Sequence, residues 1–250
     1  MPKISLNTSD EVYKPAEDSW LLVRSLPPLP GTVLEIGTGT GIVAISLALN
    51  GSKVTATDIN SKAIDLATNN AKKNNVSIEF LLGNQFEPIS NRKFDNIVCN
   101  PPYLPKSSTE YHDQALELAV EGGPTGAEFT INLVEQTPHY LEENGRFILL
   151  ISSRMGDLPK GWNSEILARE KFGLTEINNS PLARLFRAYR KTDPGLRNMV
   201  CGGRDLRVAA ANIKAQAYYH EWIDGNPEFK SDEKWYELVL LAERSTDDSE

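Results

Sequence analysis

The stretch from Thr32 to Leu49, TVLEIGTGTGIVAISLAL, decides the fold because it joins a short apolar run to an apolar helical run through a glycine-rich turn. Thr32–Ile36 has the length and β-branched content of a strand, and Ile42–Leu49 has those of a compact helix. The turn between them is rich in residues without a β-carbon, so a ligand can approach the backbone where the helix begins. These glycines are Gly37, Gly39 and Gly41. The pattern predicts nucleotide-like binding at the carboxyl edge of a sheet.

Strand-like and helix-like runs alternate on both sides of this turn. The strand-like runs are Thr32–Ile36, Lys53–Thr57, Ile78–Leu82, Phe94–Cys99 and Gly145–Ser152. The helical runs are Pro15–Leu26, Ile42–Leu49, Ser61–Asn74 and Gly126–Leu141. Because strands that alternate with helices form parallel sheets, we expect an α/β fold with a doubly wound, mostly parallel sheet.

The pattern is weaker towards the C-terminus. Asn163–Phe172 has helical spacing and Gly173 as its stop, and Leu174–Asn178 resembles another strand. Either Leu185–Tyr189 or Trp235–Leu241 supplies the final strand, and we favour the second because it is longer and more apolar. That choice makes residues 184–230 an insertion.

The chain therefore divides into five parts. We expect a ligand-covering segment and helix at 1–30, a ligand-binding core at 31–183, a basic insertion at 184–230 with a helix over Arg207–Trp222, a last strand at 231–244 and a frayed acidic tail at 245–250.

Composition narrows the functional classes. The 250 residues suit one domain, and the start of the chain lacks the plan of a signal peptide, while no apolar run is long enough for a membrane span. We therefore expect a soluble, cytoplasmic protein without membrane contact. Cys99 lies in an apolar run and reads as a buried thiol, and the scattered His112, His139 and His220 show no ligand spacing, so we expect no metal site.

Charge is unevenly distributed along the chain. The net charge of −8 argues against broad binding to nucleic acid, because phosphate contacts require surplus Lys and Arg. The segment 184–214 nevertheless carries +6, which leaves −14 elsewhere. A solvated helical face explains this segment, and RNA contact is the alternative.

The glycine turn resembles the first motif of class I S-adenosylmethionine methyltransferases, an acidic residue followed by Gly-x-Gly-x-Gly. Ile42 breaks the dinucleotide spacing Gly-x-Gly-x-x-Gly, and Glu35 matches the acidic position, which in that family faces the methionine end of the cofactor. Asp58 ends the second strand, where a carboxylate can accept both ribose hydroxyls, although a helix cap is an alternative. Asn84 stands where the family often has an Asp that binds the adenine amino group.

The tetrapeptide Asn100-Pro101-Pro102-Tyr103 follows the fourth strand. The lone pair of an amide or amino nitrogen is delocalised, so such a nitrogen needs to be held in position. The Asn100 side-chain oxygen and the Pro101 carbonyl can accept its two N–H groups while Tyr103 packs on its planar face. The tetrapeptide matches the signature of methyltransferases that act on glutamine amides or on exocyclic base amines, so it does not separate these substrates.

The string from Glu11 to Ser19, EVYKPAEDS, resembles the HemK-like branch of release-factor glutamine methyltransferases, eukaryotic and archaeal type. The resemblance runs from about Glu11 through Ser152. It implies a seven-stranded Rossmann-like sheet with an antiparallel last strand, S-adenosylmethionine as cofactor, and N5-methylation of the glutamine in the Gly-Gly-Gln loop of a peptide-chain release factor. The implied cofactor residues are Tyr13, Pro15, Glu17, Asp18, Glu35, Gly37, Thr38, Gly39, Gly41, Asp58, Ile59, Asn84, Gln85 and Asn100, and the implied catalytic residues are Asn100, Pro101, Pro102 and Tyr103.

Several alternatives stay open. The same branch often pairs with a small zinc-binding activator of the Trm112 type, for which Ser77–Leu82 is a candidate docking edge, although an ordinary sheet strand explains this run as well. The basic segment 184–214 favours a second functional hypothesis, adenine-N6 or guanine-N2 methylation of RNA or DNA. Relatives also methylate lysine. A catalytically silent cofactor-binding subunit is a third reading, and the intact Asn100–Tyr103 tetrapeptide argues against it.

Overall fold

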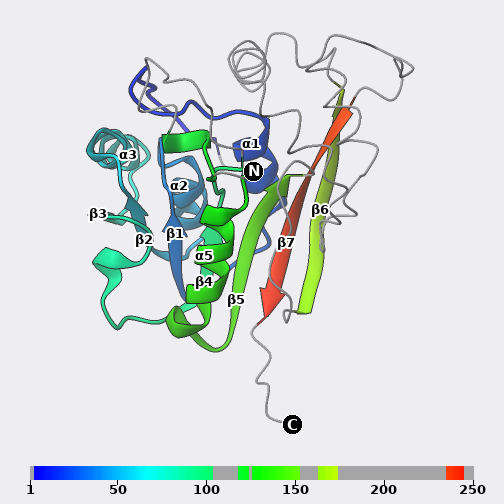
Figure 1. Ribbon diagram of the computed structural model, residues 1–250. Coiled ribbons are helices and arrows are strands. Elements are labelled where there is room, and N and C mark those ends of the chain that lie inside the picture. Colours follow the sequence, from blue (N-terminus) through cyan, green and yellow to red (C-terminus); the bar gives the residue numbers. More distant parts are fainter. Residues whose placement is uncertain (1–2, 104–117, 124–125, 153–162, 174–234, 245–250) are drawn as a thin grey trace.

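The computed structural model describes residues 3–103, 118–123, 126–152, 163–173 and 235–244. Within these residues a sheet of seven strands runs in the order β3-β2-β1-β4-β5-β7-β6 (Figure 1). The strands are β1 (Thr32–Ile36), β2 (Lys53–Asp58), β3 (Glu79–Leu82), β4 (Phe94–Cys99), β5 (Leu141–Ser152), β6 (Asn163–Gly173) and β7 (Trp235–Arg244). Strands β1 to β5 pair in parallel, and β7 runs antiparallel to both β5 and β6. The predicted mostly parallel sheet with an antiparallel last strand is confirmed.

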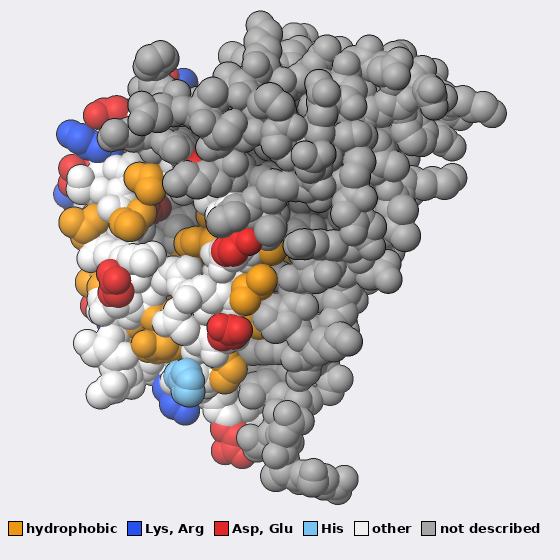
Figure 2. Space-filling model, viewed as in Figure 1, with side chains coloured by type: hydrophobic (Ala, Val, Ile, Leu, Met, Phe, Trp, Pro, Cys, Tyr) orange, Lys and Arg blue, Asp and Glu red, His pale blue; other side chains and the backbone are white. Residues whose placement is uncertain are grey.

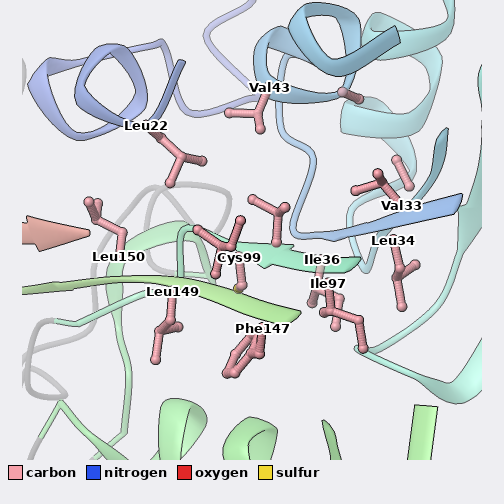
Figure 3. Packing of buried hydrophobic residues seen from close by; sticks show 14 of the residues in the cluster. Leu22, Val33, Leu34, Ile36, Val43, Ile97, Cys99, Phe147, Leu149 and Leu150 are labelled. Carbon is pink, nitrogen blue, oxygen red and sulfur yellow. The ribbon is translucent and has the colours of Figure 1, made fainter. Parts of the chain in front are cut away.

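Helices cover both faces of the sheet. The helices α1 (Glu17–Ser25), α2 (Ile42–Leu49) and α3 (Ser61–Lys73) lie on one face, and α5 (Glu128–Gln136) lies on the other (Figures 1 and 3). There are also two short 3-10 turns, η1 (Glu87–Ile89) and η2 (Thr137–Tyr140).

The core lies between these layers. Leu22 of α1 and Val43 of α2 point towards one face of the sheet. Phe147 and Leu149 of β5 project from the opposite face (Figure 3). Leu22, Phe147 and Leu149 are fully buried. Burying a side chain of this size contributes roughly 1.5–3 kcal/mol, so the two apolar layers fix the sheet as a rigid base for the residues at its edge.

The helix predicted over Asn163–Phe172 is wrong, because this segment is strand β6. It pairs antiparallel with β7 from Asn163↔Arg244 to Gly173↔Trp235, with an irregularity between Ile166 and Ala168. Helical spacing is a local property, whereas this pairing joins segments far apart in the chain. The partner strand overrides the local preference.

The structure also tests the predictions for the last strand and for the end of α5. Trp235–Arg244 is the strand that completes the sheet, as favoured over Leu185–Tyr189. The helix predicted to run to Leu141 ends instead at Gln136 and passes into η2, because Pro138 has no N–H and its ring does not fit a helix interior.

Other predictions fall outside the described residues. These are the strands at Leu174–Asn178 and Leu185–Tyr189, the insertion at 184–230 with its helix at Arg207–Trp222, the tail at 245–250, and His112 and His220. Cys99 is a free, buried thiol, as expected. Among the described helices, none has the length and apolarity needed to cross a bilayer. Figure 2 shows acidic and apolar side chains interspersed over the described part of one face, in keeping with the acidic composition.

Candidate active site

The glycine turn forms the floor of a pocket at the carboxyl edge of the sheet. The backbone N–H groups of Gly37 and Thr38 both donate to the carbonyl of Thr57, at 2.9 and 3.0 Å, which ties the turn to the end of β2. Gly37 and Gly39 adopt φ angles of 76° and 53°, and a β-carbon built on either one would meet nothing within 4 Å. The turn therefore leaves open space where side chains would otherwise project.

Gly41 has a different role from the other two glycines. It precedes α2 with φ of 80°, and it does not line the pocket. A β-carbon at this position would lie 3.0 Å from Cβ and 3.2 Å from Cα of Ala67 on α3. Gly41 thus allows close packing of α2 against α3. Its contact with a ligand stays a prediction.

Glu35 lies at the end of β1 and is 4% exposed. The Thr38 hydroxyl donates to its Oε2 at 2.6 Å. Burial raises the pKa of Glu35 from 4.5 to about 8, because an ionised carboxylate loses its hydration there, and the Thr38 hydrogen bond only partly offsets this loss. Glu35 is therefore poised to bind a cationic group or to hold a proton.

Asp58 ends β2 and places its carboxylate beside the glycine turn. Its Oδ2 accepts the N–H of Gly39 at 2.8 Å, and its Oδ1 accepts the N–H of Asn60 at 2.9 Å. Burial raises the pKa of Asp58, and these backbone hydrogen bonds oppose the rise. The cap of α3 is Asn60, whose side chain accepts the N–H of Lys62 at 2.9 Å. Asp58 is thus not the helix cap, and each of its oxygens keeps acceptor capacity for a ligand.

The segment after β3 lines one side of the pocket. Asn84 is exposed, and its N–H donates to Glu87 Oε2 at 3.1 Å. Gln85 has φ of 47°, and its carbonyl accepts the Thr57 hydroxyl at 3.1 Å. Ile59, after β2, is 53% exposed and offers an apolar surface at the pocket rim.

The tetrapeptide Asn100–Tyr103 continues from β4 into the same pocket. Pro101 and Tyr103 are buried, with Tyr103 only 4% exposed. The Asn100 Nδ2 donates to Asp18 Oδ2 at 3.1 Å. The Asn100 Oδ1 is buried and has no hydrogen-bond partner among the residues that the structure describes. A buried acceptor without a partner costs about 1–3 kcal/mol, so its position points to a ligand.

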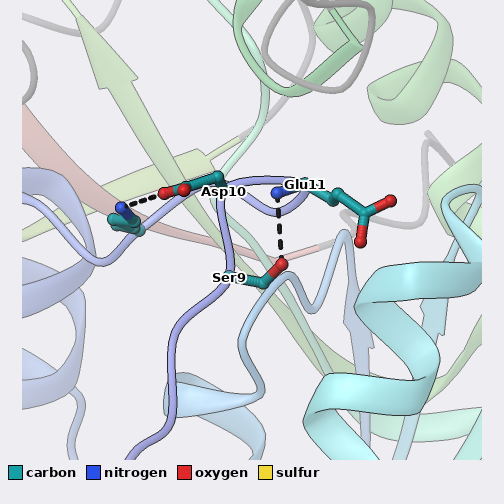
Figure 4. A network of polar contacts seen from close by, with 4 residues as sticks. Ser9, Asp10 and Glu11 are labelled. Carbon is teal, nitrogen blue, oxygen red and sulfur yellow. Dashed lines mark hydrogen bonds and ion pairs between the residues drawn. The ribbon is translucent and has the colours of Figure 1, made fainter.

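The N-terminal segment crosses α3 before it reaches the pocket. Two amide side chains at the C-terminal end of α3 hold it. Asn70 exchanges hydrogen bonds with the backbone of Asn7 at 2.7 and 3.1 Å, and the C-cap residue Asn74 does so with that of Ser5 at 2.9 and 2.8 Å. A tight turn at Ser9–Glu11 then redirects the chain (Figure 4).

Beyond this turn the N-terminal segment lines the pocket with Tyr13, Pro15 and Asp18. Glu17 begins α1, and its side chain lies outside the described set. All other predicted site residues except Gly41 lie around this one pocket. Sequence reasoning missed apolar lining residues, among them Val12, Leu118, Val120 and Phe129. They carry no motif, and only the fold reveals their place.

A mostly parallel sheet with a glycine turn after β1 and Asn-Pro-Pro-Tyr after β4 defines a Rossmann-like methyltransferase. Comparison with known proteins agrees: residues 13–176 match the model of the methyltransferase small domain family. The chain belongs to that family.

The chain is similar in sequence to proteins that are named as glutamine methyltransferases. The chain is 42% identical over 183 residues to a protein of Methanocaldococcus jannaschii provisionally named a protein N5-glutamine methyltransferase, over 70% of this chain and 92% of that protein. It is 36% identical over 168 residues to the release factor glutamine methyltransferase of Aquifex aeolicus, over 62% of this chain and 58% of that enzyme. The corresponding enzyme of Geobacter sulfurreducens is 32% identical over 144 residues, 54% of this chain and 51% of its own length. The chain thus spans nearly all of the first relative and little more than half of the other two.

Proposed function

We propose that this protein transfers a methyl group from S-adenosylmethionine to the side-chain N5 of the glutamine in the Gly-Gly-Gln loop of a peptide-chain release factor. The single observation that carries the proposal is the buried Asn100 Oδ1, which lies in the pocket without a partner among the described residues. The names of the Methanocaldococcus and Aquifex relatives support the glutamine amide as acceptor.

The pocket residues fit the proposed cofactor. Open space over Gly37 and Gly39 suits close approach of a ligand to the backbone, and Asp58 retains lone pairs that can accept ribose hydroxyls. Glu35, buried beneath the turn, would pair with the cationic amino group of the methionine end, and Ile59 offers an apolar surface for the adenine. When bound, the cofactor supplies an electrophilic methyl group on a sulfonium.

The residues of the chain then have to hold the substrate amide nitrogen, which is a weak nucleophile, in position. The Asn100 Oδ1 would accept one N–H of the substrate amide, and the Pro101 carbonyl the other, so that the amide plane is fixed. Tyr103, which lines the pocket and is almost fully buried, would provide a flat apolar wall for that plane. Acceptors already in place cost no reorganisation during the reaction, and this kind of preorganisation needs no general base before transfer.

The test is transfer of labelled methyl from S-adenosylmethionine to a purified release factor, with total RNA as the competing acceptor. We expect label in the release factor and its loss when the loop glutamine is replaced by alanine. Label in RNA alone would overturn the acceptor and favour the base-amine alternative, for which the basic segment 184–214 is the supporting sequence feature. Label in neither, together with normal cofactor binding, would favour a silent cofactor-binding subunit.

A partner protein is the second part of the proposal. Strand β3 forms one edge of the described sheet, and Leu82 on it is 57% exposed. This edge supports docking of a small zinc-binding activator of the Trm112 type, because an unpaired strand edge can accept another strand. Co-expression with such a partner should raise activity, and Leu82→Lys should reduce the gain without lowering the activity of the isolated chain.

A further inference from the structure

The amide of Asn100 can work as an acceptor only if its oxygen faces the substrate. An asparagine amide has an oxygen and a nitrogen of nearly equal size, so its orientation is set by its partners. The Asn100 Nδ2 donates to Asp18 Oδ2 at 3.1 Å. An ionised carboxylate only accepts hydrogen bonds, so it can face the nitrogen but not the oxygen of Asn100.

Asp18 is itself held in place. It is 3% exposed and lies in the first turn of α1, whose Leu22 is fully buried in the core. Its Oδ1 accepts the backbone N–H of Ser19 at 2.6 Å and the Ser19 hydroxyl at 3.2 Å. The Tyr13 hydroxyl donates to the same Oδ2 that faces Asn100, at 3.5 Å. The carboxylate thus connects an anchored helix to the end of β4.

We infer that Asp18 is a positioning residue that locks the Asn100 amide with Oδ1 towards the acceptor nitrogen, rather than a ligand of the cofactor. The inference deepens the proposed function and rests on it. Without the carboxylate, the amide could turn and present Nδ2 to the substrate, where a donor would meet the substrate N–H. The buried, unpartnered Oδ1 is the atom that this lock keeps available.

The test compares Asp18→Ala and Asp18→Asn with Asn100→Ala. We expect Asp18→Ala to lower kcat about 10- to 100-fold while the cofactor Kd changes less than about threefold, since only the orientation of Asn100 is lost. Asp18→Asn keeps the volume of the side chain and retains an oxygen that can face Nδ2, so its loss should be smaller. Asp10→Asn makes the same chemical change at an exposed ion pair with Lys14 and should leave activity unchanged.

The double variant separates positioning from an independent role. If Asp18 acts through Asn100, adding Asp18→Ala to Asn100→Ala should lower kcat no further. A further tenfold loss, or a cofactor Kd that weakens in parallel with kcat, would overturn the inference. If Asp18→Ala does not fold, Asp18→Asn in the Asn100→Ala background carries the same comparison.

A spectroscopic arm is independent of the acceptor. The side-chain amide signals of Asn100 can be assigned by their absence in Asn100→Asp. In Asp18→Ala these signals should move towards those of a freely rotating amide, and in Asp10→Asn they should not. Signals unmoved by Asp18→Ala would refute the lock, whereas a wild-type protein that labels no release factor would refute only the proposed acceptor.

Discussion

The two ends of the pocket differ in whether their polar side-chain atoms have hydrogen-bond partners. At the glycine turn, Asp58 already accepts two backbone N–H groups and Glu35 accepts the Thr38 hydroxyl. At the end of β4, the Asn100 Oδ1 is left without a partner among the described residues, although its own nitrogen is anchored. The polar atoms at the first end are already held by hydrogen bonds within the protein, whereas the second end leaves one buried acceptor open. Under the proposed function, the first end binds the cofactor and the second holds the substrate amide.

The largest expected effect is at the catalytic end. Asn100→Ala should lower kcat by about 10²- to 10³-fold, the range seen when a preorganised polar contact to the reacting group is removed. The cofactor Kd should stay within about threefold of wild type. Steady-state transfer assays and calorimetric binding measure the two quantities separately. Equal kcat in the two proteins would mean that the pocket performs no chemistry through Asn100.

The next effect is at the binding end. Gly37→Ala should weaken cofactor binding about tenfold or more, because the added β-carbon enters space that faces the pocket, while kcat at saturation stays close to wild type. Gly51→Ala is the matched control, because Gly51 also has a positive φ, of 92°, with nothing within 4 Å, but lies outside the pocket. Both variants should lose about 1–2 kcal/mol of stability from the left-handed backbone. An unchanged Kd in Gly37→Ala would remove the glycine turn from the binding site.

A packing glycine gives a smaller and different effect. Gly41→Ala should destabilise the fold by about 2 kcal/mol, since its β-carbon meets Ala67 and its φ is positive, with little change in cofactor affinity. Ala67→Gly in the same chain should relieve the contact, so the double variant should be less destabilised than the sum of the single ones. Denaturant unfolding measures all three. Strict additivity would show that the two residues do not constrain each other.

The smallest expected effect, counted per pH unit, is a pH dependence of stability at Glu35. The unfolded chain releases this proton near 4.5 and the folded chain near 8, so the folded state without cofactor binds more protons between these values. The contribution of Glu35 to the free energy of unfolding is therefore fully present below pH 4.5. It is lost as the pH rises towards 8, by at most about 1.4 kcal/mol per pH unit. Glu35→Gln should flatten the curve over this range. Denaturant unfolding at several pH values tests this, and parallel curves for both proteins would contradict it.

Local signals in the sequence predicted much of this molecule. The strands from Thr32 to Cys99 and the residues that follow them could be placed because each motif lies within a few positions of its strand. The strand character of Asn163–Gly173 could not, because it depends on pairing with Trp235–Arg244, a long-range contact. For the same reason, the hydrogen bond from Asn100 to Asp18, which lie 82 positions apart, could not be predicted from the sequence. Gly41 shows a further limit, since a glycine motif does not reveal which glycine lines the pocket and which packs against a helix.

The most direct test is mass spectrometry of a release factor after incubation with this protein and S-adenosylmethionine, with the Asn100→Ala variant alongside. We predict one added methyl group on the glutamine of the Gly-Gly-Gln loop with the wild-type protein and almost none with the variant. Methylation at another residue, or equal methylation by both proteins, would contradict it.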